Sequence, residues 1–465
     1  MNRRTFLQIT AGALFPLLSC GRFRRKQPNI IFIMADDLGY ADLGCYGQEK
    51  IRTPHLDRMA AEGIRLTDHY AGSTVCAPAR CTLMTGLHTG HAVVRGNYEV
   101  QPEGQYPLPP ESLTVGEVLQ AAGYATGVIG KWGLGGPGSS GEPNRQGFDY
   151  WYGHLCQREA HFYYDDHLWR NGKKVVLEGN DPQRQTGQYV HDLFTREALQ
   201  FIERNQQGPF FLYLPYTIPH AELAVPEDSL AAYRGQFPET PFPGGHYGAQ
   251  PAPHAAYGAM ITRMDRDIGR VFRLLQDLEI DENTLVIFTS DNGPSTAGGI
   301  DPVFFDSNGP LRGGKRDLYE GGIRVPLIAR WPGRIKPGTV SNHPSAFWDF
   351  LPTAVEIAGI KPPDGIDGIS YLPALMGKPQ PVHEYFYWEF PAQGGKQAVR
   401  MGRWKGVRLN TRTDPNGAIE LYDLANDVGE ARNVASEHPD VVRQITDIMQ
   451  QAHTDSGAFP LFGQT

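Results

Sequence analysis

Four continuous apolar runs constrain the fold of this chain more than any other feature of its sequence. They occupy residues 29–34, 124–129, 210–214 and 284–289. Non-alternating runs of this length are typical of strands buried on both faces of a parallel sheet. Helix-like segments lie between or beside them, at residues 54–62, 114–122, 191–205 and 257–278. This alternation predicts an α/β fold, with a large domain whose mostly parallel central sheet is flanked by helices.

The C-terminal part of the chain has a different pattern. Residues 361–381 are rich in Pro and Gly and separate it from the rest. Beyond them, residues 385–388, 397–401 and 404–409 have the character of short strands, and residues 440–452 that of a helix. The sequence therefore predicts a large domain over residues 28–380, followed by a small antiparallel sheet with one helix over residues 381–465.

Polar residues follow each apolar run of the large domain. They are, in chain order, Asp36 and Asp37, Lys131, His220, and Asp291 and Asn292. Ligands of such sheets bind beyond the carboxyl ends of the strands, so these side chains are expected to converge. The Asp and Asn oxygens favour Ca²⁺ or Mg²⁺ over Zn²⁺. The alternative is that both acidic segments are ordinary turns, since an Asn-Gly pair suits one.

A short helix is predicted from Cys76 to the residue before Gly86. Pro78 fits its first turn, and Gly86 is placed to end it. Cys76 then lies at the N-terminal end, where free amides and the helix dipole favour an anion. Arg80 follows one turn later on the same face. Taken alone, this segment is also compatible with a capped helix that carries a thiol of low pKa.

The segment 76–86 resembles the signature of type I sulfatases, the formylglycine-dependent, arylsulfatase-like family of the alkaline phosphatase superfamily. In that family the Cys is oxidised to formylglycine after translation. Further segments resemble sulfatase motifs in the family's order: residues 35–40, 130–132, 289–293, 309–315, 320–326 and 421–424. The resemblance covers roughly residues 28–435. It implies an alkaline-phosphatase-like catalytic domain and hydrolysis of sulfate esters.

Carried over to this sequence, the resemblance assigns two groups of residues. One Ca²⁺ would be held by Asp36, Asp37, the modified Cys76, Asp291 and Asn292. Catalysis would use Cys76, Arg80, Lys131, His220 and Lys315. Arg80 and Lys131 would fix the formylglycine hydrate, while His220 and Lys315 would contact the sulfate and the bridging oxygen. One hydroxyl of the hydrate would attack sulfur, His220 would protonate the leaving alcohol, and the second hydroxyl would expel sulfate.

One position departs from the family pattern. Many members have a histidine two residues after the lysine of the motif at 130–132, and here Gly133 stands there. A contact to the nucleophile or the sulfate is therefore missing. Nothing nearby in the sequence obviously replaces it.

The leaving alcohol is not encoded in these motifs. His88, His91, Arg95 and Asn97 follow the signature helix, and His161 begins an aromatic segment; we expect them as substrate contacts. Residues 387–389 either line a sugar pocket or pack in a core. The expected substrate is a sulfated carbohydrate, and an aryl sulfate is the alternative. Two alternatives remain open: a phosphodiesterase or phosphonate monoester hydrolase, and a weakly catalytic surface protein that binds sulfated glycans.

The N-terminus has the features of an export signal. Residues 1–19 resemble a twin-arginine signal peptide that ends in a lipobox, and lipidation of Cys20 would tether the protein to a membrane. The alternative is ordinary cleavage and a soluble periplasmic product. Residues 20–27 form a basic tether. We expect an exported protein, periplasmic or at the outer membrane or cell surface.

Net charge and cysteine content limit the further partners and cross-links that the sequence allows. The net charge of −8 argues against nucleic acid binding through a broad basic face. The five cysteines do not form a disulfide framework. Cys45, Cys81 and Cys156 are expected to be buried thiols, with a bridge from Cys45 to Cys156 or Cys81 as the alternative. A formylglycine at position 76 would require a formylglycine-generating enzyme or an anaerobic sulfatase-maturating enzyme as a partner.

Overall fold

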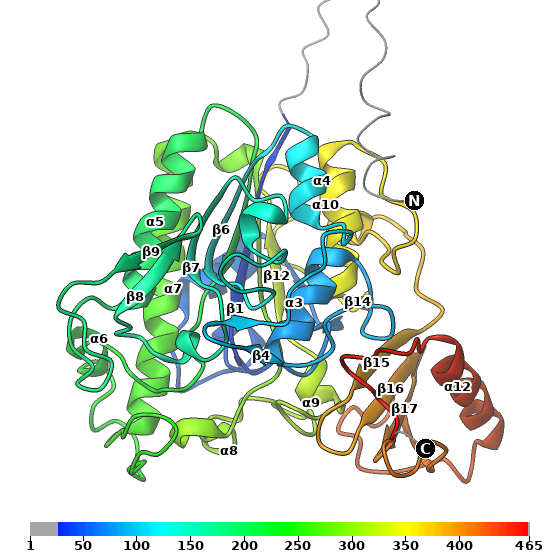
Figure 1. Cartoon of the computed structure of the whole chain (residues 1–465). Coiled ribbons are helices and arrows are strands. Elements are labelled where there is room, and N and C mark those ends of the chain that lie inside the picture. Colours follow the sequence, from blue (N-terminus) through cyan, green and yellow to red (C-terminus); the bar gives the residue numbers. More distant parts are fainter. Residues whose placement is uncertain (1–26, 464–465) are drawn as a thin grey trace, which may run out of the picture.

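The computed structural model describes residues 27–463, and within them a ten-stranded mixed sheet forms the centre of the molecule (Figure 1). From one edge to the other its strands are β13 (Thr339–Ser341), β2 (Ile64–Leu66), β12 (Leu327–Arg330), β11 (Thr284–Ser290), β1 (Asn29–Ala35), β10 (Phe210–Pro215), β6 (Ala125–Lys131), β7 (Tyr150–His154), β8 (His167–Arg170) and β9 (Lys173–Val176). The run from β11 to β7 is parallel. Antiparallel pairing begins at β12 on one side and at β8 on the other. The predicted α/β fold is confirmed, with a parallel centre and mixed edges.

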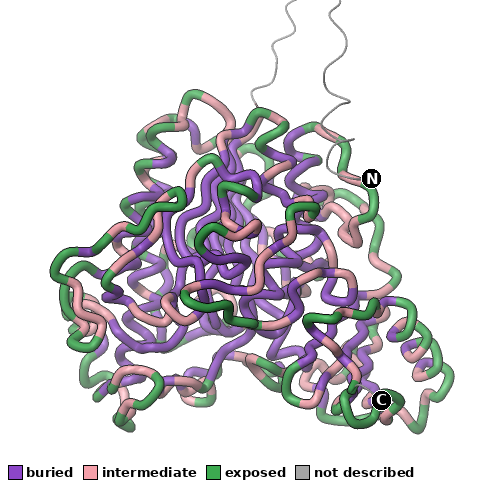
Figure 2. The backbone as a smooth tube through the Cα atoms, viewed as in Figure 1, coloured by how far each residue is buried: buried purple, intermediate pink, exposed green. Residues whose placement is uncertain are grey.

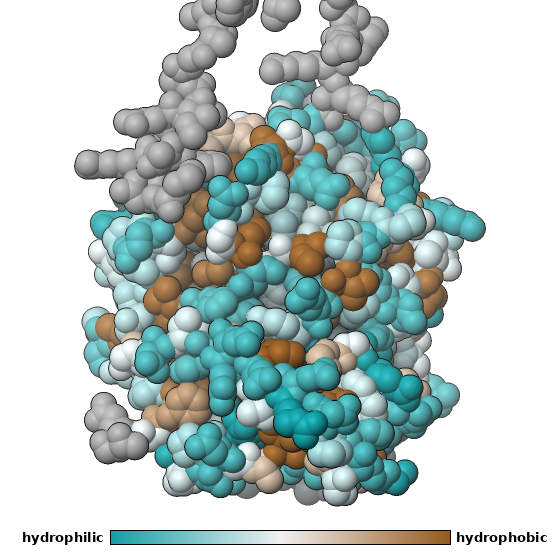
Figure 3. Space-filling model, turned by 90° about the vertical axis from the view of Figure 1, so that its right-hand side faces the viewer, coloured by the Kyte–Doolittle hydropathy of each residue, from teal (hydrophilic) through white to brown (hydrophobic). Residues whose placement is uncertain are grey.

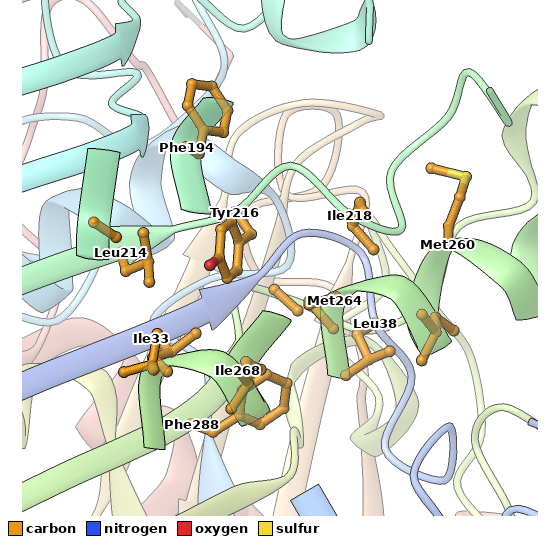
Figure 4. Close-up of a cluster of buried hydrophobic side chains, with 14 of the residues drawn as sticks. Ile33, Leu38, Phe194, Leu214, Tyr216, Ile218, Met260, Met264, Ile268 and Phe288 are labelled. Atoms are coloured by element: carbon orange, nitrogen blue, oxygen red, sulfur yellow. The ribbon is translucent and has the colours of Figure 1, made fainter. Parts of the chain in front are cut away.

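Helices cover both faces of this sheet. One layer contains α2 (Pro54–Glu62), α5 (Val190–Asn205) and α7 (Pro253–Asp277); the other contains α3 (Cys76–Thr85), α4 (Val115–Ala121) and α10 (Phe350–Ala358). Strand β1 contributes side chains to the cores beneath both helix layers, because successive side chains of a strand point to opposite faces of the sheet. Ile31 and Ile33 join the core of the first layer, whereas Ile30 and Phe32 join that of the second. Figure 4 shows Ile33 among residues of the first core, including Met264 and Ile268 of α7.

The chain ends in a small antiparallel sheet, as predicted. Its strands are β15 (Phe386–Phe390), β16 (Lys396–Met401), β17 (Trp404–Leu409) and β18 (Ile419–Asp423), followed by α12 (Pro439–Gln451). Tyr387 faces the same cluster as Ile445 of α12, whereas Trp388 packs with Tyr70 and Trp348 of the large domain. Both faces of the small sheet are therefore buried (Figure 2).

The predicted helix bounds agree with the structure for α2 and α3, whereas α7 begins at Pro253, four residues before its predicted start. Helix α2 has its predicted bounds, and α3 ends before Gly86, whose φ of 72° suits glycine. The short elements of the described residues include β3 (His69–Tyr70), β4 (Glu99–Val100), β5 (Gly104–Gln105), the 3-10 helix η3 (Glu159–His161), α6 (Glu227–Leu230), α8 (Pro302–Phe305), α9 (Glu320–Ile323), β14 (Ser345–Ala346) and α11 (Leu372–Leu375).

The predicted signal peptide, the lipobox with Cys20 and most of the basic tether lie outside the described residues. Within residues 27–463, none of the helices combines the length and apolarity needed to cross a membrane. On the face shown in Figure 3, hydrophobic side chains are scattered among hydrophilic ones. Cys45, Cys76, Cys81 and Cys156 are free thiols, and of these only Cys45 is partly exposed.

Candidate active site

The polar residues predicted to converge do meet at one edge of the sheet. Strands β11, β1, β10 and β6 are neighbours and run parallel, so their carboxyl ends lie together. The side chains that they supply are Asp291 and Asn292 after β11, Asp36 and Asp37 after β1, His220 after β10, and Lys131 at the end of β6. All of them are buried. The alternative of two independent turns is thereby ruled out.

Asp36 lies at the centre of this cluster. Its Oδ2 accepts hydrogen bonds from Lys131 Nζ at 2.5 Å and from Arg80 Nη2 at 3.2 Å. Its Oδ1 lies 3.5 Å from Cys76 Sγ. Burial by itself would raise the pKa of Asp36, but the positive charges, Lys131 foremost, hold it well below its usual value. Asp36 therefore stays ionised beside Cys76.

Asp37 is the second anionic centre. Lys315 Nζ donates to its two carboxylate oxygens at 2.6 and 2.8 Å, and it also lies 3.6 Å from Cys76 Sγ. Asn292 Nδ2 donates to Asp37 Oδ1 at 2.8 Å. Lys315 lies in the loop before α9. The backbone N–H of Lys315 donates a hydrogen bond to Pro294 O, which fixes this loop. A lysine that belongs to none of the four strand ends thus completes the site.

Arg80 joins the signature helix to the strand ends. Its Nη2 donates to Asp291 Oδ2 at 2.8 Å, and its Nη1 donates to the backbone carbonyl of Lys131. Burial and the neighbouring Asp36 raise the pKa of Asp291 to about 6. The guanidinium is fully buried, so its fixed charge compensates carboxylates that water does not reach.

Helix α3 presents Cys76 to this cluster. Cys76 is its first residue, and every residue of the helix is buried. The helix lacks a side-chain cap from its own preceding residue, Val75; instead, the backbone N–H of Ala77 donates to Asn97 Oδ1 at 2.9 Å. Burial and Asp36 raise the pKa of the Cys76 thiol to about 12. This direction is opposite to the low pKa that the position at a helix N-terminus would by itself favour.

The donor set fits a divalent cation. Asp36, Asp37, Cys76 and His220 each offer a ligand atom, and these atoms all lie within 4.8 Å of one another. Asn292 Oδ1 is buried and has no hydrogen-bond partner, which is costly unless a cation takes its lone pairs. The oxygens of Asp36, Asp37 and Asn292 suit a hard cation such as Ca²⁺, whereas Cys76 and His220 offer a thiol and an imidazole that Zn²⁺ also accepts, so the donor set fits a divalent cation without selecting one.

His220 lies against Asp37 and a second histidine. Its Nδ1 is 2.5 Å from the carbonyl oxygen of Ala221, which can only accept, so Nδ1 carries the proton. Its Nε2 lies 3.4 Å from Asp37 Oδ2, and burial and Lys315 hold the pKa of His220 well below its usual value. The ring of His161 stacks on that of His220, with 4.6 Å between centroids. His161, predicted as a substrate contact, therefore does border the site.

Comparisons with known proteins agree with this geometry. The family model described as Sulfatase matches residues 28–360, and that described as N-sulphoglucosamine sulphohydrolase, C-terminal, matches residues 313–455. The chain belongs to the type I sulfatase family of the alkaline phosphatase superfamily. It is a sulfuric ester hydrolase.

Several relatives match this sulfatase over nearly its whole length. It is 32% identical to N-acetylgalactosamine-6-sulfatase of Canis lupus familiaris, over 92% of this chain and 86% of the relative. It is 33% identical to arylsulfatase A of Homo sapiens, over 94% and 90%. N-acetylgalactosamine-6-O-sulfatase of Bacteroides thetaiotaomicron is 30% identical, over 92% and 94%. The crystal structure of Ps i-CgsB in complex with k-i-k-neocarrahexaose superposes with a TM-score of 0.80 and 28% identity, over 95% and 96% of the two chains.

The other predicted substrate contacts of the sulfatase have partners within the protein. Arg95 is buried and donates to Glu389 Oε1 at 2.7 Å. His91 Nδ1 lies 2.9 Å from Asp367 Oδ1, and His88 stacks on His91. These contacts tie the segment after α3 to later parts of the chain. A direct contact of His91, Arg95 or Asn97 with substrate stays a prediction.

The aromatic segment at residues 387–389 packs in a core and does not line a pocket. Tyr387, Trp388 and Glu389 are fully buried. Tyr387 Oη donates to Glu389 Oε2, and Trp388 Nε1 donates to the carbonyl of Ala71. Of the two interpretations, core packing is confirmed.

Sequence reasoning missed three residues near the site. Tyr247 and His246 lie against His161, with ring centroids 5.4 and 5.9 Å away, and both come from a loop without regular structure. Gln157 lies over Gly133 beside Arg80. A Gly-rich loop and a lone glutamine give no motif, so only the folded chain reveals them.

Proposed function

We propose that this sulfatase releases sulfate from a carbohydrate sulfate ester, with Cys76 converted to formylglycine and one Ca²⁺ bound beside it. The observation that carries the proposal is the position of Cys76 Sγ, 3.5 Å from Asp36 Oδ1 and 3.6 Å from Lys315 Nζ. The side chain at position 76 thus lies between the two acids of a cation site and the cations that an anionic ester needs.

Formylglycine at position 76 would be hydrated and supply two hydroxyls, one to attack sulfur and one to expel sulfate after the alcohol has left. Ca²⁺ held by Asp36, Asp37, Asp291 and Asn292 would polarise the sulfate oxygens and favour the ionised nucleophile. The unpaired Asn292 Oδ1 supports this assignment.

The basic residues of the site would together stabilise the negative charge that develops during attack on sulfur. Lys131 and Lys315 are each hydrogen-bonded to an acid beside Cys76, so they are held where charge develops during attack. Arg80 keeps Asp36 and Asp291 in place. His220 is the proposed acid for the leaving oxygen; because Nδ1 carries the proton of the neutral ring, Nε2 must take up a second proton before it can act.

A carbohydrate substrate is supported by two lines. Relatives named N-acetylgalactosamine-6-sulfatase match over nearly the whole chain. In addition, His161, His246 and Tyr247 place rings at the margin of the site, and planar rings are suited to stack on sugars.

Mass spectrometry and substrate panels test the proposal. Conversion of the Cys76 thiol to the aldehyde lowers the mass of its tryptic peptide by about 18 Da. Sulfated mono- and oligosaccharides should be turned over, and Cys76→Ala should abolish turnover while binding of the sugar remains. Sulfate and phosphate esters of one phenol, assayed in parallel, separate a sulfatase from a phosphodiesterase or phosphonate hydrolase. An unmodified Cys76 in a fully active enzyme would refute the proposal.

We also propose export of this protein through its twin-arginine-like signal, with lipidation of Cys20. The support is the sequence of residues 1–20 alone. Cell fractionation of the full chain and of Cys20→Ala tests this: the wild type should partition with membranes and the variant should be released into the soluble periplasmic fraction.

A further inference from the structure

A buried amide in this molecule makes no contact that explains its burial. Gln157 is 5% exposed, yet neither Nε2 nor Oε1 has a hydrogen-bond partner. An amide removed from water without a partner costs free energy, so a partner from outside the protein is expected. The segment that carries Gln157 is itself well fixed, because the N–H of Gly133 donates to Leu155 O at 3.0 Å and that of Trp132 to His154 O at 2.9 Å.

The amide lies at the active site. A β-carbon built on Gly133 would be 2.1 Å from Gln157 Nε2 and 3.7 Å from Arg80 Cδ. Gln157 therefore occupies the space that a side chain at position 133 would fill, next to the stem of Arg80. Arg80 Nε is also buried and unpaired. The unpaired polar atoms of Gln157 and Arg80 thus lie around Gly133, two residues after Lys131 in the chain.

One segment supplies both sides of the site. Gln157 lies beside Arg80, and four residues later His161 stacks on His220. The backbone N–H of Glu222 donates to His161 O, which anchors the far end of the segment. Gln157 and His161 therefore flank the cluster around Cys76 and Asp36, and Gln157 adds a neutral group to the fixed cations.

We propose that the Gln157 amide binds the sulfate group of the substrate, donating a hydrogen bond from Nε2 to a sulfate oxygen. The inference rests on the proposed sulfatase site and deepens it, since it names a sulfate contact outside the charged cluster. A neutral amide suits this place, because it adds a donor without another charge beside Arg80 and Lys131. It also explains why position 133 has no side chain: with φ of +79° and the amide in contact, only glycine fits.

Gln157→Met is the test variant, because it keeps the volume of the side chain and removes the amide. The probe is inorganic sulfate, measured by calorimetry and as a competitive inhibitor of turnover. We expect about a tenfold loss of sulfate affinity and of kcat/KM, the size of one hydrogen bond to a charged group. The thermal unfolding midpoint should stay the same or rise, because the amide makes no bond in the fold. Sulfate affinity and kcat/KM within twofold of the wild type would overturn the inference.

Three further variants sharpen the result. Gln157→Glu should lose more affinity than Gln157→Met, since a carboxylate repels sulfate. Gly133→Ala should displace the amide and reduce affinity in the wild type, but have a smaller effect in the Gln157→Met background, which is the non-additivity of groups in contact. Gln146→Met is the matched control, because Gln146 is buried with an unpaired Oε1 but hydrogen-bonds Ser140 away from the site. Its sulfate affinity should equal that of the wild type.

The calorimetric arm separates this inference from the proposed function. It needs no turnover, so it can be run on Cys76→Ala with and without Gln157→Met. Loss of sulfate affinity in the double variant supports the role of Gln157 even if position 76 proves unmodified. Equal affinity in both refutes that role even if the wild type is an active carbohydrate sulfatase.

Discussion

Asn97 Oδ1 accepts a hydrogen bond from the backbone N–H of Ala77, the residue after Cys76, at 2.9 Å. The first turn of α3 otherwise has no side-chain cap. A residue twenty positions away in the chain thus fixes the helix end that carries the reactive side chain. Asn97 is exposed and was predicted to contact substrate. The hydrogen bond gives it a second role, in holding Cys76 in place.

Asn97→Ala should destabilise the protein by about 1 kcal/mol, the usual cost of losing an N-terminal cap. Asn97→Asp should retain stability, because it keeps the acceptor and adds a negative charge at the helix N-terminus. Chemical denaturation of the three proteins measures the difference. Equal stability of the Ala variant and the wild type would show that the bond does not act as a cap.

Arg95 and Glu389 join the segment after α3 to the C-terminal sheet, and both side chains are buried. Arg95→Met should cost about 3 kcal/mol of stability, because Glu389 stays buried and keeps only one of its two ion-pair partners, His453, whose Nδ1 lies 2.7 Å from its Oε2. Thermal unfolding measures the loss, and KM of the remaining folded enzyme should not change.

The matched control for this pair is Arg95→Met combined with Glu389→Gln. The double variant removes both charges and should recover part of the lost stability, since Tyr387 can still donate to the amide oxygen. A raised KM with unchanged stability in Arg95→Met would instead establish the substrate contact expected from the sequence.

The strand ends of the active site were predictable because local chemistry marks them. Each apolar run is long enough to identify a buried strand, and the polar residue after it falls at the carboxyl end whatever the strand order. Asp36 and Asn292 could therefore be placed together although they are distant in the chain. Helix α2 was equally clear, because Pro54 and Gly63 mark its two ends.

The edges of the sheet and the neutral side of the site could not be predicted. Strands β2 and β13 have three residues each, too few for a periodic signal. Gln157 follows the short strand β7 and belongs to no motif, so its position over Gly133 depends on tertiary packing alone. Likewise, no pattern links Arg95 with a glutamate that lies 294 residues later.

Ca²⁺ should stabilise this sulfatase through Asn292. After treatment with a chelator, Ca²⁺ added at a hundredfold excess over its Kd should raise the free energy of unfolding by about 2.7 kcal/mol. In Asn292→Leu the shift should be much smaller, because the unpaired oxygen is gone. Differential scanning calorimetry with and without Ca²⁺ measures both.

Asn283→Ala serves as the control for Asn292→Leu, since Asn283 donates to the carbonyl of Gln27 far from the strand ends that bear the acids. It should respond to Ca²⁺ as the wild type does. If the unfolding midpoint of the wild type is the same with and without Ca²⁺, the proposed cation site is contradicted.

Asp265 should make stability fall as the pH rises towards neutrality. Its carboxyl group accepts hydrogen bonds from the N–H groups of His55 at 3.1 Å and Leu56 at 2.7 Å, at the start of α2. Burial raises its pKa from 3.8 to about 7 despite these bonds. The folded state therefore holds a proton that the unfolded state releases, and the associated stability is present below about pH 4 and lost as the pH rises through about 7.

Asp265→Asn removes this titration and keeps a neutral acceptor for α2. Its unfolding midpoint relative to the wild type should therefore rise between pH 5 and 8 and level off above the pKa. Asp277→Asn is the control, because Asp277 is exposed and lies at the end of α7, the helix that also carries Asp265. Its stability difference from the wild type should not follow this curve. A constant offset between Asp265→Asn and the wild type over this pH range would mean that the carboxyl group is ionised in the folded protein throughout. The two backbone bonds would then outweigh the cost of burying the charge.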